Sequence, residues 1–167
     1  MKKVLSIVLM LMLCALPVFA EEAAEDIEVT PEIMLEKCGF TIEPAPNSTD
    51  VKYDVIELPE AEYPIGEVQF TYNGIVCTYR AQASNEVTPM DISGLTREWT
   101  EYLDGEVSGH FAMINNCADA SVITWFDDVV GINYSLSTNT QVKTEALMKM
   151  ANGLYVPLQG EAEGDAE

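Results

Sequence analysis

The stretch GEVQFTYNGIVCTYRAQ, residues 66–82, restricts the possible folds more than any other part of the chain. Its two halves alternate apolar and polar side chains around Asn73-Gly74, which is the pattern of a β-hairpin closed by a two-residue type I′ turn. Such a turn fixes the register of the two strands. The expected cross-strand pairs are Tyr72 with Ile75, Phe70 with Cys77, Val68 with Tyr79 and Glu67 with Arg80. The first three pairs share an apolar face, so the hairpin predicts an antiparallel sheet with one buried side.

Two side chains of this hairpin carry predictions of their own. Glu67 and Arg80 are expected to form a cross-strand ion pair worth roughly 0.2–1 kcal/mol. Cys77 is expected to be a buried thiol, because free cysteine is among the most buried residue types. With Cys38 and Cys117 it makes an odd number of cysteines outside residues 1–20, so at most one internal disulfide is expected and its partners stay open.

Several further segments have the composition of strands. Tyr53–Leu58 alternates apolar and polar residues, and Val122–Phe126 is expected to pair with Ile132–Leu136. Asp104-Gly105, a dipeptide favoured in hairpin turns, is expected to connect two more strands. A turn is also expected at Asn115–Cys117. These segments extend the sheet on both sides of the first hairpin.

Helix signals lie at both ends of this strand-rich region. A short helix is expected between a Thr30 N-cap and Gly39, which suits a left-handed C-terminal stop. A longer helix is expected to begin near Thr140 and to carry an i,i+4 ion pair between Glu145 and Lys149. Its apolar side comprises Val142, Ala146, Leu147, Met150, Ala151 and Leu154. Together these elements predict an α+β fold: an antiparallel sheet of about six or seven strands, with the C-terminal helix and a short N-terminal helix packed on one face.

The N-terminal residues predict export. Lys2 and Lys3 precede the apolar run Val4–Leu16, and Ala20 offers a small residue at a cleavage position, so residues 1–20 are predicted to be a signal peptide. The alternative, a lipid anchor on Cys14, is disfavoured by the bulky residue before it. Residues 21–29 are predicted to be an acidic disordered leader, 30–158 one α+β domain, and 159–167 an acidic disordered tail. The mature chain is expected to lack a membrane span and to be secreted.

The charge of the chain narrows its possible partners. Aspartate and glutamate number 28 against 8 lysines and arginines, which gives a net charge of −20. Such a field repels nucleic acid, so no nucleic-acid partner is expected. No two cysteines have metal-ligand spacing and there is a single histidine, so neither a metal site nor a cofactor is predicted.

Five segments taken together resemble a known family. They are TYRAQ (78–82), DISGLTREW (91–99), ITWFDD (123–128), GINYSLS (131–137) and EALMKMA (145–151). In this order they are similar to the bacterial secreted domain of unknown function numbered four-three-six-seven, over about residues 50–155. The resemblance implies a domain that stands alone after a signal peptide or forms the extracytoplasmic part of membrane proteins related to anti-sigma factors. It implies no catalytic residue.

Candidate functional residues fall into three groups. Trp99, Tyr102, Trp125 and Tyr134 are candidates for a groove that binds a protein, peptide or glycan, with packing in the core as the alternative. His110 is the one side chain suited to act as the base of a serine or cysteine hydrolase. Asp127-Asp128 is a candidate acidic pair, although a turn explains two adjacent aspartates better.

The predicted function is a secreted, non-catalytic binding or sensing module with an unknown ligand. The alternatives are a secreted hydrolase that uses His110 or an acidic pair, and a protein-interaction or inhibitor domain that acts through an edge strand. The binding surface is expected on the sheet face opposite the C-terminal helix, or in the loops Pro59–Gly66 and Ala83–Gly94.

Overall fold

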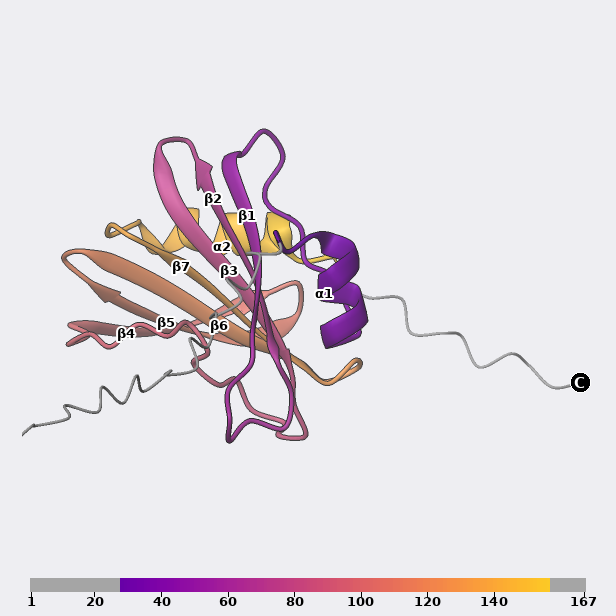
Figure 1. Cartoon of the computed structure of the whole chain (residues 1–167). Helices are drawn as coiled ribbons and strands as arrows, with labels where there is room; N and C mark the ends of the chain where they lie inside the picture. Colours follow the sequence, from indigo (N-terminus) through magenta and orange to yellow (C-terminus); the bar gives the residue numbers. More distant parts are fainter. Residues whose placement is uncertain (1–27, 157–167) are drawn as a thin grey trace, which may run out of the picture.

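A seven-stranded antiparallel sheet with two helices against it forms the fold, which confirms the predicted α+β class (Figure 1). The computed structural model describes residues 28–156. The predicted signal peptide, the acidic tail and most of the acidic leader lie outside these residues. The elements are α1 (Pro31–Cys38), β1 (Thr49–Ile56), β2 (Ile65–Tyr72), β3 (Ile75–Ala83), β4 (Glu101–Val107), β5 (His110–Cys117), β6 (Ala120–Asp127), β7 (Ile132–Thr138) and α2 (Thr144–Leu154).

The sheet consists of two meanders that meet in its middle. Its strand order is β1-β2-β3-β7-β6-β5-β4, so β1 to β3 form one meander, β4 to β7 form the other, and β3 pairs with β7. The connection 84–100 leads from the centre of the sheet to the far edge. It crosses the face opposite the helices, where the Met90 N–H donates to Asn133 Oδ1 at 3.0 Å. Part of the face that was expected to bind a ligand is therefore covered by the chain itself.

The first hairpin has the predicted register in every pair. Asn73 and Gly74 both have positive φ, 52° and 78°, as a type I′ turn requires. The expected ion pair forms, but its carboxylate is buried: Glu67 is 3% exposed, and its Oε2 lies 2.5 Å from Arg80 Nε. Arg80 also donates to the Ile92 carbonyl at 2.9 Å, in the connection that crosses this face. The pair therefore belongs to the interior of the protein.

The turn expected at Asp104-Gly105 is wrong, because both residues lie inside β4. The chain turns at Ser108-Gly109, where φ is 49° and 92°, and Val107 pairs with His110. Gly105 has another role: a Cβ there would lie 2.8 Å from Ile114 Cδ1 and 3.0 Å from Met148 Sδ. Side chains from β5 and α2 fill the space beside Gly105, so a larger residue there would have to displace them.

Two other predicted boundaries are also wrong. Residues 115–117 continue β5, and the turn follows at 118–119. Helix α2 begins at Thr144, after an N-cap position that makes no side-chain hydrogen bond. The preceding residues are held by β6, since the Val142 N–H donates to Ser121 Oγ at 2.9 Å. Among the described residues, no ion pair joins Glu145 to Lys149.

Both helices contribute to one hydrophobic core on the same side of the sheet. Met34 of α1 and Leu147 of α2 are fully buried and belong to the same cluster, which also contains Phe70 and Ile123. Within the described part of the chain, no helix has both the length and the apolar character needed to cross a membrane.

The three cysteines of the described part are free thiols. Cys77 is buried, as predicted, and burial raises its pKa to about 11. Cys117 is buried as well, whereas Cys38 is half-buried at the end of α1. The thiolate is the reactive form, so burial and a high pKa both protect Cys77 from reagents.

We expect iodoacetamide to alkylate Cys38 of the native protein well before Cys77 and Cys117 at about pH 8. Mass spectrometry of proteolytic fragments would measure the three rates. In denaturant the three rates should become similar, because burial is lost. Equal rates for Cys38 and Cys77 in the native protein would contradict the buried position of Cys77.

Candidate functional site

The four aromatic residues proposed as a groove do not lie together. Trp125 is 0% exposed, and Tyr134 is buried on the same face of the sheet, under the helices. Tyr102 is 69% exposed and points from β4 toward the opposite face. Trp99 is half-buried in the connection that precedes β4. The structure thus places Trp125 and Tyr134 in the core and Tyr102 on the surface, so the four residues do not line one groove.

Trp125 and Tyr134 are the centre of an aromatic cluster in the core. Their rings stack with centroids 5.2 Å apart, and Tyr79 stacks on Trp125 at 6.0 Å. Tyr155, which follows α2, meets both Trp125 and Tyr134 edge-on. Stacked and edge-on pairs of this kind stabilise a core beyond the area that they bury. These aromatic residues hold the C-terminal end of α2 against the sheet.

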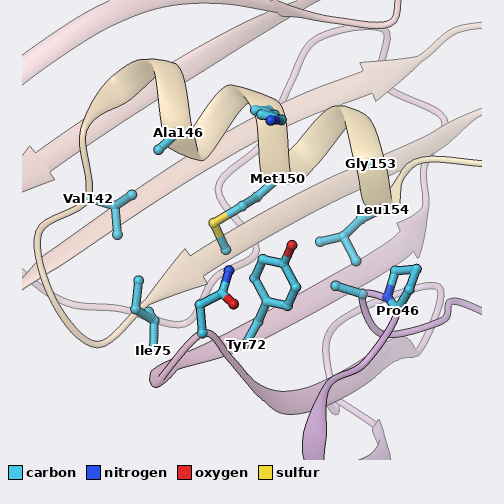
Figure 2. Close-up of a pocket in the computed structure, with 11 residues that line it drawn as sticks. Pro46, Tyr72, Ile75, Val142, Ala146, Met150, Gly153 and Leu154 are labelled. Atoms are coloured by element: carbon cyan, nitrogen blue, oxygen red, sulfur yellow. The ribbon is translucent and has the colours of Figure 1, made fainter.

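An open cleft lies between α2 and the β2–β3 hairpin (Figure 2). Its volume is about 390 Å³, within the range of about 300–1,000 Å³ typical of small-molecule sites. In Figure 2 the Tyr72 ring stands below α2, between Met150 and Pro46. The lining residues are Ala45, Pro46, Tyr72, Asn73, Ile75, Val142, Ala146, Lys149, Met150, Gly153 and Leu154. Most of this surface is apolar.

The cleft follows from where small residues fall on α2. Ala146, Met150 and Gly153 recur at helical spacing and therefore line one side of the helix. Ala146 was expected to pack in the core, but it is exposed in the cleft. A Cβ at Gly153 would have no atom within 4 Å. The space remains open because neither residue has a side chain long enough to reach Tyr72 and Ile75, the last pair before the hairpin turn.

The charge of the cleft differs from that of the whole chain. None of its lining residues is acidic, although the chain has 28 aspartates and glutamates. Lys149 is its one basic residue, and among residues 28–156 no carboxylate forms an ion pair with it. An apolar cavity with an unpaired ammonium group suits a ligand that has an apolar body and an anionic end.

His110 and the acidic pair come together in the structure. His110 Nδ1 lies 3.8 Å from Asp128 Oδ1, and His110 Nε2 lies 4.0 Å from Asp127 Oδ1. The buried Asp127 carboxylate accepts hydrogen bonds from the backbone N–H groups of Val129 and Val130, as its expected turn role requires. Within residues 28–156, no serine or cysteine side chain is hydrogen-bonded to His110. Within the described residues, His110 therefore lacks the hydrogen-bonded serine or cysteine nucleophile that the His110 version of the alternative hydrolase would need.

Sequence reasoning did not identify the cleft. It placed Ala146 and Met150 on an apolar helix face and assigned that whole face to the core. The available signal was the pair of small residues, Ala146 and Gly153, at helical spacing beside Lys149. Comparisons with protein-family models, with curated protein sequences and with solved structures give no match to this chain. The resemblance to the secreted domain of unknown function remains a prediction.

Proposed function

We propose that this protein is a non-catalytic extracytoplasmic binding module that holds a small amphipathic ligand in the cleft between α2 and the β2–β3 hairpin. The cleft itself is the observation that supports the proposal, because it is concave, mostly apolar and open to solvent. The apolar lining would bury the ligand's hydrocarbon part, which contributes roughly 0.8 kcal/mol for each buried CH₂ group. The location outside the cytoplasm rests on the predicted signal peptide, residues 1–20.

Lys149 supports an anionic end group on this ligand. Lys149 lines the cleft, and none of the other lining residues has a carboxylate. A medium-chain carboxylate would place its alkyl chain beside Tyr72 and Met150 and its carboxylate beside Lys149. The sensing role that the sequence suggested would then consist of a response to such molecules outside the cell.

We expect decanoate to bind the protein and the Ala146→Trp variant to lose this binding, because the indole would fill the cleft. Lys149→Gln should weaken decanoate binding by up to about fivefold, since an exposed charge pair contributes roughly 0.2–1 kcal/mol. Isothermal titration calorimetry would measure both effects. Lys143→Gln is the matched control, because Lys143 lies at the start of the same helix outside the cleft.

Neutral 1-decanol separates the two parts of the proposal. Its binding should be abolished by Ala146→Trp and left unchanged by Lys149→Gln, because only the carboxylate interacts with the ammonium group. Decanoate binding that survives Ala146→Trp would place the ligand elsewhere. An equal effect of Lys149→Gln on both ligands would show that Lys149 does not recognise the anionic end.

A further inference from the structure

Three potential metal ligands converge at one end of strands β5 and β6. His110, Asp127 and Asp128 each place a ligating atom within 4.8 Å of the others. The sheet register brings them together: Ala112 pairs with Trp125, so His110 comes beside Asp127 two residues further along the ladder. Asp128 follows at the start of the β6–β7 turn. Their proximity is thus a consequence of antiparallel pairing, which motif spacing in the sequence does not reveal.

The orientation of His110 is fixed by Tyr155. The Tyr155 hydroxyl donates to the Asp127 carboxylate, and it lies 3.2 Å from His110 Nε2. The phenol has one O–H proton, and this hydrogen bond uses it. Because that proton is directed to Asp127, the hydroxyl accepts from His110 Nε2–H. In the neutral imidazole, Nδ1 then carries the lone pair and lies 3.8 Å from Asp128 Oδ1.

This hydrogen-bond chain matches the surroundings of metal-binding histidines. Such a histidine donates its second ring N–H to a carboxylate, a carbonyl or a water molecule, which fixes its tautomer and its direction. Here the donation passes through Tyr155 to the Asp127 carboxylate. The Asp127 carboxylate has about four lone-pair positions, and three of them accept hydrogen bonds. One position is therefore left for a cation. Asp128 is 76% exposed at its side chain and is free to adjust.

We propose that His110, Asp127 and Asp128 form a binding site for one divalent transition-metal ion of the zinc class. One imidazole nitrogen and two carboxylate oxygens suit zinc, whereas calcium and magnesium prefer oxygen ligands alone. The two carboxylates supply the negative charge. The site is independent of the cleft beside α2 and does not depend on the amphipathic ligand proposed there.

Solvent can reach this site from one side. His110 and Asp128 line an opening of about 480 Å³ that also involves Thr88, Pro89 and Phe111. Three protein ligands leave at least one coordination position for water or for a small molecule. A metal ion can enter through this opening. The opening also leaves room for a water or small molecule at the free coordination position.

The single histidine of the chain makes the test direct, because its ring protons give one set of NMR signals. In the full chain near neutral pH, Zn²⁺ should shift these signals and saturate them at one equivalent, while Ca²⁺ should not. Calorimetry should show Zn²⁺ binding weakened by more than about tenfold in His110→Gln and in Asp128→Asn, since each removes a ligand. Asp128 is exposed, so Asp128→Asn should preserve the fold.

Asp104→Asn is the matched control, because it removes an exposed carboxylate from β4 with the same change in charge. Its zinc affinity should equal that of the unchanged chain. Zinc binding without a shift of the His110 signals would overturn the proposal, and so would equal affinity in Asp128→Asn. An equal response to Ca²⁺ would overturn the assignment to zinc. A thiolate-to-metal charge-transfer band with Co²⁺ would place the ion on a cysteine and overturn it as well.

Discussion

Replacing Trp125 with alanine is expected to lower the free energy of unfolding by about 3–5 kcal/mol, because the change removes a fully buried aromatic side chain. The indole stacks on Tyr79 and Tyr134, so these partners lose contacts on both sides of the resulting cavity. Urea unfolding followed by circular dichroism would measure the effect. Most domains have a total stability of about 5–15 kcal/mol, so this loss should be a large share of the total.

Tyr102→Ala is the control for this experiment. Tyr102 was a candidate for the same binding groove, but it is largely exposed, so its removal should change stability by no more than about 0.5 kcal/mol. A Trp125→Ala variant that kept its stability and lost only ligand binding would contradict the core position of this indole and restore it as a binding residue.

Arg80→Leu is expected to destabilise the protein by a similar amount, about 3–5 kcal/mol, because it leaves the buried Glu67 carboxylate without its positive partner. Only the hydrogen bond from Gln69 Nε2, at 2.6 Å, would remain on that carboxylate. The same change removes the hydrogen bond from Arg80 to the Ile92 carbonyl, so the connection 84–100 loses one of its contacts with the sheet. Chemical unfolding would measure the loss.

The double variant Glu67→Leu/Arg80→Leu should recover much of this stability, because a buried ion pair replaced by apolar side chains of similar volume costs little. The exposed pair Lys37–Glu57 is the matched control, and Lys37→Leu should cost at most about 1 kcal/mol. If Arg80→Leu were as mild as Lys37→Leu, this would contradict the buried position of the Glu67–Arg80 pair.

Local signals in the sequence were sufficient for part of the fold. Asn73-Gly74 defines its own turn and register within a few residues. Val122–Phe126 is a mostly apolar run, and Ile132–Leu136 alternates apolar and polar residues. Asp104-Gly105 shows where this reasoning fails. Asp-Gly is a favoured hairpin turn, yet Gly105 lies within a strand, where Met148 of α2 packs closely against it. That contact joins residues distant in sequence, and no local pattern contains it.

The same distinction explains what was missed at the functional sites. The burial of Glu67 depends on the path of the connection 84–100, and the start of α2 depends on Ser121. The cleft is a space bounded by a hairpin, a helix and the loop at Ala45, so it exists only once all three are in place. The types of the contributing residues were visible in the sequence, but their distances from one another were not.

The arrangement of the two meanders has a consequence for the order in which the chain folds. Within each meander every strand pairs with its neighbour in sequence, so these contacts can form early and independently. The pairing of β3 with β7 instead joins residues 77–83 to residues 132–138 and must close a long loop first. We therefore expect the joining of the two halves to set the folding rate. Until it occurs, both β3 and β7 present an unpaired edge on which a second chain could associate.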